Sequence, residues 1–402
     1  MATIIFFPDI DEGHLYPTLS FANLIKKRGH DVYFLGIPDI KEIVESRGLN
    51  FFTVFEDVYP QGFIKEYKNA QKENKDSFIQ LFRRPHLDLI LSGQLDEIFD
   101  KLQPDLLIIN YALPIETLIF QSRYCFKLLI FTSWLRNQWA SPSVICNTIF
   151  NHLPESQKLR ILKAIDPDST MTAKLLNTLD SITEIIPCPR EIDFPDADYS
   201  TSVVHIETGI NPKKERSNFL NNLCVGTKKL IYASLGSQSM LYPHSKEFYQ
   251  LMIDTMDSGF NSEWHLIMSV GPDFKMDEFI IKSDKISIFN WVPQVELLDK
   301  ACIAIIHGGL GTIKECVLAK VPMILFPMDY DQNNNADRVQ YHNLGIKMNT
   351  EINWAELKKT IESTCMNMSI KRDIQIMNEK FTKIEKKTPG IRYIESLIRK
   401  KR

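Results

Sequence analysis

The sequence predicts an α/β protein built from two doubly wound domains. Its 402 residues exceed what one ordinary hydrophobic core accommodates. Short apolar runs alternate with helical patterns, which indicates the βαβ units of parallel sheets. Hydrophobic residues make up 44% of the chain and charged residues 24%, as in globular proteins.

The first series of elements begins near the N-terminus. Ile4–Phe7 is short, apolar and β-favouring, which is typical of a fully buried strand. A loop over 8–13 and a helical pattern up to Arg28 follow, with Gly29 as the stop signal. The run 32–35 then predicts the next strand, which completes a strand–helix–strand unit.

The same alternation continues along the chain. Further strands of the first domain are expected at 104–109 and 127–131, and strands of a second domain at 229–234, 264–270, 286–289, 303–306 and 323–326. The aromatic-rich stretch 51–84 is interpreted as loops and short helices over one edge of the first sheet. Residues 193–222 combine proline, glycine and charges with little periodicity, which favours an interdomain linker, and 392–402 reads as a basic helical tail.

Charge and cysteine usage exclude some classes of protein. A formal net charge of −3 argues against a protein that coats nucleic acid. The seven cysteines are scattered without a C-x-x-C pair, which fits reduced thiols better than a disulfide framework or a zinc site. With neither a signal peptide nor an apolar run of membrane-spanning length, we expect a soluble cytoplasmic protein. We also expect a monomer or weak dimer.

A glycine loop is the best candidate for binding an anion. The segment His307-Gly-Gly-Leu-Gly-Thr312 follows an apolar strand and precedes a helix. Glycines let a backbone approach phosphate closely, and a helix N-terminus attracts it. A tight turn that binds nothing is the alternative, but the complete strand–loop–helix context favours phosphate. Dinucleotide and Walker fingerprints are absent.

A longer pattern surrounds this loop. It consists of Trp291-Val-Pro-Gln294, the loop itself, Glu315, Pro322 and Asp331-Gln332. Two further matches lie outside this block, at Ser234-Leu-Gly-Ser237 and Gly13-His14-x-x-Pro17. In order and spacing it resembles the donor-binding signature of the UDP-glycosyltransferase family, in its bacterial macrolide and natural-product branch. That resemblance implies the GT-B fold, two Rossmann-like domains facing across a cleft. Residues 1–205 would bind the acceptor, with a C-terminal helix at about 386–402 packing back on them, and 206–385 would bind the donor.

The resemblance also implies roles for single residues. Trp291 would stack on uracil, Gln294 would meet the base or ribose, and Glu315 would hold the ribose hydroxyls. An indole can stack on a flat base, and a carboxylate can accept hydrogen bonds from two hydroxyls at once. The diphosphate would face Ser237, His307, Gly309, Gly311 and Thr312, and the sugar hydroxyls would meet Asp331 and Gln332.

His14 would be the general base that takes the acceptor's proton in an inverting transfer. The family usually orients this histidine with an Asp from a later strand, but the matching position holds Asn110. An amide can hold the imidazole tautomer but supplies no charge to stabilise imidazolium. Three hypotheses stay open: a weak base for acidic phenols, a substitute carboxylate from Asp9, Asp11 or Glu116, or a poor transferase.

The acceptor is expected in the first domain, as a small, largely apolar or aromatic natural product. Its candidate lining residues are Phe55, Phe63, Phe82 and Trp134, and an interpretation of the aromatics as local core stays open. The donor would be a UDP-sugar, with glucose expected and dTDP open, and no essential metal or other cofactor. The alternatives are a GT-B nucleotide-sugar epimerase and a catalytically weak or silent nucleotide-sugar-binding subunit.

Overall fold

The computed structural model divides the chain into two compact units. Unit 1 comprises Met1–Pro187, Asp198–Gly209 and Thr388–Arg402, and unit 2 comprises Cys188–Ala197 and Ile210–Lys387. The structure describes residues 1–73, 84–136, 141–165, 173–197, 202–210, 228–329, 331–349 and 351–399, with single positions at 219, 223 and 226. The sequence-based boundary after residue 205 lies close to the observed one after Gly209. The chain also crosses between the units at 187–198, which the sequence did not indicate.

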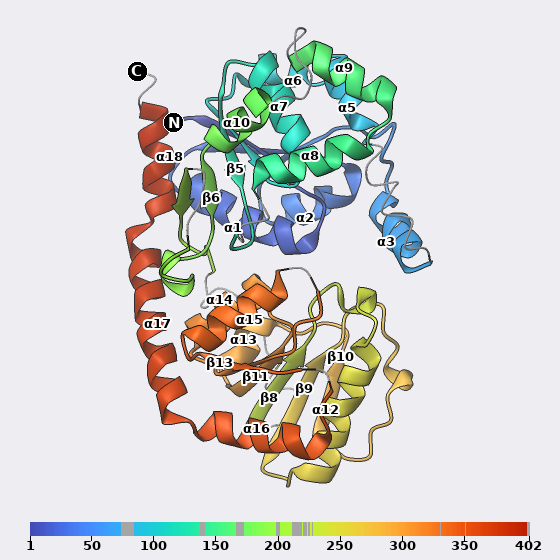
Figure 1. The fold of residues 1–402 in the computed structure, drawn as a ribbon, viewed down its shortest axis with the longest axis vertical. Coiled ribbons are helices and arrows are strands. Elements are labelled where there is room, and N and C mark those ends of the chain that lie inside the picture. Colours follow the sequence, from blue (N-terminus) through green and yellow to red (C-terminus); the bar gives the residue numbers. More distant parts are fainter. Residues whose placement is uncertain are drawn as a thin grey trace. The chain divides into compact units, whose positions relative to one another are not determined.

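Unit 1 is a seven-stranded parallel sheet with the order β3-β2-β1-β4-β5-β6-β7 (Figure 1). Its strands are β1 (Thr3–Phe7), β2 (Asp31–Gly36), β3 (Asn50–Thr53), β4 (Leu106–Asn110), β5 (Lys127–Phe131), β6 (Glu184–Ile186) and β7 (Val203–His205). Its helices are α1 (Glu12–Lys27), α2 (Lys41–Ser46), α3 (Phe63–Glu73), α5 (His86–Leu91), α6 (Asp96–Leu102), α7 (Pro114–Arg123), α8 (Pro142–His152), α9 (Glu155–Ile165), α10 (Ala173–Ser181) and α18 (Pro389–Arg399).

Helices cover both faces of this sheet, which explains the apolar runs in the sequence. In β1, Ile4 and Phe6 pack in one core cluster with side chains of α1 and α18, while Ile5 and Phe7 pack in another with side chains of α7. Successive side chains of a strand point to opposite faces. A strand covered on both faces therefore needs apolar residues at every position.

Unit 2 is a six-stranded parallel sheet with the order β10-β9-β8-β11-β12-β13. Its strands are β8 (Lys229–Ser234), β9 (Trp264–Ser269), β10 (Ile286–Phe289), β11 (Ala301–Ile306), β12 (Met323–Leu325) and β13 (Gly345–Lys347). Its helices are α12 (Ser245–Gly259), α13 (Gln294–Leu298), α14 (Leu310–Ala319), α15 (Gln332–Tyr341), α16 (Trp354–Met366) and α17 (Met368–Lys387). Short 3₁₀ helices lie at Arg190–Ile192, Ser239–Leu241 and Met276–Glu278 in this unit, and at Pro38–Ile40 in unit 1.

The C-terminal helix α18 returns to unit 1, and a buried carboxylate fixes its start. Glu207 accepts hydrogen bonds from the backbone N–H groups of Gly390 and Ile391, at 2.7 and 3.2 Å. These groups have no partner within the helix, and the helix dipole favours an anion at that end. Leu397 and Ile398 pack on the same core cluster as β1.

Two predictions about irregular segments are wrong in part. Residues 50–53, at the start of the aromatic stretch, form the edge strand β3. Residues 203–205, in the segment interpreted as a linker, form β7 and pair with β6. Both strands are very short, so the period of two is not resolved in the sequence. No helix among the described residues is long and apolar enough to cross a membrane.

Candidate active site

The carboxyl ends of β1 and β4 carry the polar groups of unit 1 that the sequence singles out. These strands are direct neighbours, with Phe7 opposite Ile109. The chain leaves β1 through a short loop, and Asp11 caps α1 by accepting from the Gly13 N–H at 3.0 Å. His14 therefore sits in the first turn of α1, above the edge of the sheet where ligands of such folds bind.

Asp9 is the carboxylate that holds His14. Its Oδ2 lies 2.7 Å from the Nδ1 atom of the imidazole, and both side chains remain about one fifth exposed. Burial raises the pKa of Asp9, but the hydrogen bond and charge of His14, the Ile10 N–H and the charge of Arg84 outweigh it and leave the pKa below its ordinary value. Asp9 is thus ionised at neutral pH and can only accept, so Nδ1 carries the proton.

Asn110 does not take that place. Its Oδ1 accepts from the backbone N–H of Ala112 at 2.9 Å, and its Nδ2 has no hydrogen-bond partner among the described residues. The side chain is only 2% exposed. Of the three carboxylates considered as substitutes, Asp9 contacts His14, Asp11 caps α1, and Glu116 contacts Arg84 and His86.

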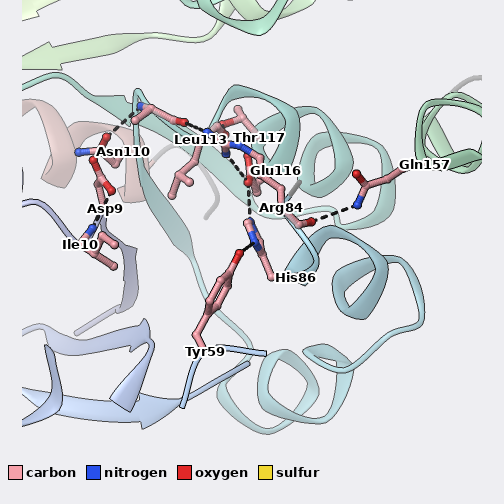
Figure 2. A network of polar contacts seen from close by, with 11 residues as sticks. Asp9, Ile10, Tyr59, Arg84, His86, Asn110, Leu113, Glu116, Thr117 and Gln157 are labelled. Atoms are coloured by element: carbon pink, nitrogen blue, oxygen red, sulfur yellow. Dashed lines mark hydrogen bonds and ion pairs between the residues drawn. The ribbon is translucent and has the colours of Figure 1, made fainter. Parts of the chain in front are cut away.

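Glu116 is fully buried in α7 and gathers two basic side chains (Figure 2). Its Oε1 lies 2.6 Å from the guanidinium of Arg84 and 2.7 Å from Nε2 of His86. His86 in turn bonds the hydroxyl of Tyr59 at 2.7 Å. Burial raises the pKa of Glu116, but the charge of Arg84 and the hydrogen bond from His86 outweigh it and lower the pKa to about 2. These hydrogen bonds hold the 84–86 segment against α7.

Two aromatic rings pack on His14, and one of them, Trp134, is among the acceptor residues expected from the sequence. Trp134 lies edge-on to the His14 ring at 6.3 Å, and Tyr111, which the sequence analysis did not single out, packs 4.0 Å from Trp134. Phe55 is 3% exposed and packs on Phe7, so it is core. Phe63 stacks beside Tyr59 and Tyr67 at the start of α3, and Phe82 lies outside the described residues.

In unit 2 the glycine loop joins β11 to α14 as predicted. Gly309 precedes the helix and has no side chain with which to cap the first-turn N–H groups of α14. Gly308 has φ +96°, and a Cβ there would lie 3.0 Å from the backbone oxygen of Gln332. Added Cβ atoms at Gly236 and Gly309 would lie 2.8 and 2.6 Å from the His307 ring, so glycine at both positions makes room for the imidazole.

The electrostatics of this loop follow from burial. Desolvation lowers the pKa of His307 to about 4, against a smaller opposite effect of a backbone hydrogen bond at Ser234. His307 is therefore neutral at pH 7. It carries a single N–H group and contributes no positive charge to the loop.

Several predicted donor residues come together around this loop. Gln294, at the start of α13, donates to Thr312 at 3.2 Å and to Glu315, and accepts from the hydroxyl of Tyr232. Trp291 is 74% exposed just before α13, and Ser237 and Gly311 are exposed as well. An exposed indole three residues before Gln294, which itself contacts Thr312 and Glu315 of α14, is an arrangement that can bind a nucleotide.

Asp331 and Gln332, at the start of α15, differ in burial. Asp331 is partly exposed and accepts from Asn335 at 2.7 Å. Gln332 is 3% exposed, accepts from the N–H groups of Met328 and Asp329, and donates to Tyr242 at 2.8 Å. Gln332 therefore shapes the loop before α15 in this structure.

Comparisons with known proteins agree with this geometry. Residues 235–388 match the Glycosyltransferase family 28 C-terminal domain. NDP-glycosyltransferase YjiC from Bacillus subtilis (strain 168) is 22% identical over 91% of this chain and 90% of its own length. The oleandomycin glycosyltransferase of Streptomyces antibioticus is 31% identical over 33% of this chain and 30% of its own.

Solved structures share the whole fold. The kitacinnamycin glycosyltransferase superimposes with a TM-score of 0.73 at 17% identity, covering 98% of both chains. The glycosyltransferase VinC in complex with dTDP gives a TM-score of 0.68 at 14% identity, covering 99% of this chain and 98% of its own. The chain therefore has the GT-B fold, carries a region similar to a glycosyltransferase C-terminal domain, and is similar over most of its length to bacterial glycosyltransferases.

Proposed function

We propose that this protein is an inverting glycosyltransferase that moves glucose from UDP-glucose to a hydroxyl of a small, largely apolar or aromatic natural product. The observation that carries the proposal is the Asp9–His14 pair at the carboxyl end of β1. An imidazole held by an ionised carboxylate is a competent general base, because the carboxylate fixes the tautomer and stabilises the imidazolium that forms. Unit 1 would bind the acceptor and unit 2 the donor.

The donor would bind along the carboxyl edge of the unit 2 sheet. Trp291 would stack on the base, Gln294 would meet base or ribose, and Glu315 would accept from the ribose hydroxyls. The diphosphate would lie at the uncapped start of α14, near Ser237, His307, Gly309, Gly311 and Thr312. Asp331 would meet the sugar hydroxyls. Gln332 would join it only after leaving its present bonds to the 328–329 backbone.

The chemistry would be one displacement at the anomeric carbon. His14 takes the proton of the acceptor hydroxyl as its oxygen attacks, and the bond from that carbon to the diphosphate breaks. Inversion follows from a single displacement. The negative charge that develops on the leaving diphosphate is stabilised by backbone N–H groups and the dipole of α14. These groups supply the stabilisation without a cation, so we expect transfer to persist in a chelator.

The test is product analysis by mass spectrometry with UDP-glucose and dTDP-glucose against phenols, macrolides and terpenoid alcohols. We expect a hexose adduct with wild type, none with His14→Ala, and a loss of about 10²–10⁴-fold in kcat with Asp9→Asn. Asn110→Ala is the matched control, because Asn110 lies on the next strand without a bond to His14. An Asp9→Asn variant as fast as wild type would contradict the assigned pair.

The same experiment separates the alternatives. A silent binding subunit would bind UDP in calorimetry and transfer to no acceptor. An epimerase would consume the nucleotide sugar without any acceptor present. Asn110 suggested the silent subunit, and the carboxylate of Asp9 beside His14 supports a transferase instead.

We further propose that the enzyme works in the cytoplasm as a monomer or weak dimer. All six cysteines in the described ranges are free thiols, as a reducing compartment would leave them. Light scattering after size exclusion checks the oligomeric state, and a stable dimer at micromolar concentration would contradict it.

A further inference from the structure

The nitrogen of His14 that must accept the proton is already hydrogen-bonded. The hydroxyl of Tyr111 lies 2.8 Å from Nε2, on the opposite side of the ring from Asp9. Since Asp9 fixes the proton on Nδ1, Nε2 presents its lone pair, and the Tyr111 hydroxyl donates to it. Asp9, His14 and Tyr111 thus form a continuous chain of carboxylate, imidazole and phenol.

Tyr111 is held firmly in this position. It follows β4 directly, and its backbone N–H donates to the oxygen of Phe131 at 3.1 Å. Its side chain is 5% exposed, belongs to the core cluster on the α7 face, and packs against Trp134. Swinging the ring away from His14 would break this packing. An acceptor hydroxyl therefore meets Nε2 through the phenol oxygen rather than in its place.

We propose that Tyr111 relays the acceptor's proton to His14. The proposal rests on the proposed transferase function. The acceptor O–H gives its proton to the Tyr111 oxygen while the Tyr111 O–H gives its proton to Nε2. The acceptor oxygen bonds to the anomeric carbon as the carbon–diphosphate bond breaks, and that electron pair stays on the nucleoside diphosphate. Imidazolium remains beside Asp9 until solvent takes its proton.

The relay selects a class of acceptor. Proton transfer between two oxygens costs little free energy when their pKa values are similar. An ordinary phenol has a pKa of about 10. Aliphatic alcohols are much weaker acids, so passing their proton to a phenol is uphill. The relay therefore favours phenolic acceptors over aliphatic ones. Among the charged groups near this chain of hydrogen bonds, Arg84 acts on the carboxylate of Asp9, Asp11 caps α1, and Glu12 pairs with Lys68.

The test compares Tyr111→Phe with Tyr124→Phe. Each removes one hydroxyl from unit 1 and keeps the ring, but Tyr124 donates to Asp96 and not to His14. With a phenol acceptor, Tyr111→Phe should lower kcat by about 10²–10⁴-fold at unchanged donor KM, and Tyr124→Phe should leave it unchanged. The plot of kcat against pH should also change. In the Tyr111→Phe variant, the limb that reports ionisation of the Asp9–His14–Tyr111 chain should disappear. A kcat that is unchanged or raised would overturn the relay.

A second measurement does not depend on the variant folding well. In mixtures of light and heavy water, two protons moving in one step give a curved dependence of kcat on deuterium fraction, and one proton gives a straight line. Wild type should show the curve, and a straight line with a normal isotope effect would overturn the proposal. If wild type transfers, His14→Ala does not, and Tyr111→Phe is fully active, only the relay fails. If wild type binds UDP but transfers to no acceptor, the proposed function itself fails.

Discussion

Replacing Glu116 by glutamine tests the buried charge network of unit 1. Burial raises the pKa of Glu116, but Arg84 and His86 outweigh it and lower it from 4.5 to about 2. Such a difference between folded and unfolded chain corresponds to about 3 kcal/mol of stability at pH 7. Because the folded pKa is the lower one, this contribution is complete above the unfolded pKa and is lost as the pH falls from about 4.5 to 2.

Glu116→Gln keeps the shape of the side chain but removes its charge. We expect its free energy of unfolding to fall by about 3 kcal/mol at pH 7, and the gap to wild type to narrow by about 1 kcal/mol at pH 4 and about 2 kcal/mol at pH 3. Hydrogen–deuterium exchange in urea, followed on peptides of α7, reports on unit 1 separately. Figure 2 shows why the effect should be local: both basic partners contact the same carboxylate.

The matched control is Glu155→Gln. Glu155 pairs with Lys158 at 2.7 Å, but its side chain is 83% exposed, so its loss should not be measurable. A destabilisation by Glu116→Gln that stays constant from pH 7 to pH 4 would refute the reasoning, because the lost energy would then not come from ionisation. A Glu116→Gln variant as stable as wild type would refute it as well.

Two further predictions concern unit 2. Trp291→Ala should weaken UDP binding by about 1–3 kcal/mol in calorimetry, whereas Trp354→Ala, another exposed indole, should not; equal affinities would remove Trp291 from the base site. Gly308→Ala should destabilise unit 2 by about 1–3 kcal/mol in urea, because φ is +96° and the added carbon meets Gln332. Gly311→Ala lies inside α14 with open space around it and should leave the stability of unit 2 unchanged or raise it. A Gly311→Ala variant less stable than Gly308→Ala would contradict this prediction.

The central strands were predictable because their sequence pattern has one physical cause. The runs 127–131 and 229–234 match the inner strands β5 and β8 residue for residue. Helices cover both faces of the unit 1 sheet, so its central strands are apolar throughout. The strands β6, β7 and β13 have three residues each and were not predicted, whereas the equally short β12 was predicted because it lies within the apolar run 323–326.

The sequence by itself determined the two parallel sheets, the glycine loop before α14 and the position of His14 after β1, because these depend on local pattern and on residues near in sequence. Tertiary structure alone decided what holds His14. Tyr111 lies 97 positions away and reaches it only because β1 and β4 pair side by side. Asp9 is five positions away, yet the direction of the loop after β1, and not the spacing, turns its carboxylate toward Nδ1. Asp9 was therefore among the carboxylates that the sequence offered beside His14, and the direction of the loop after β1 selected it.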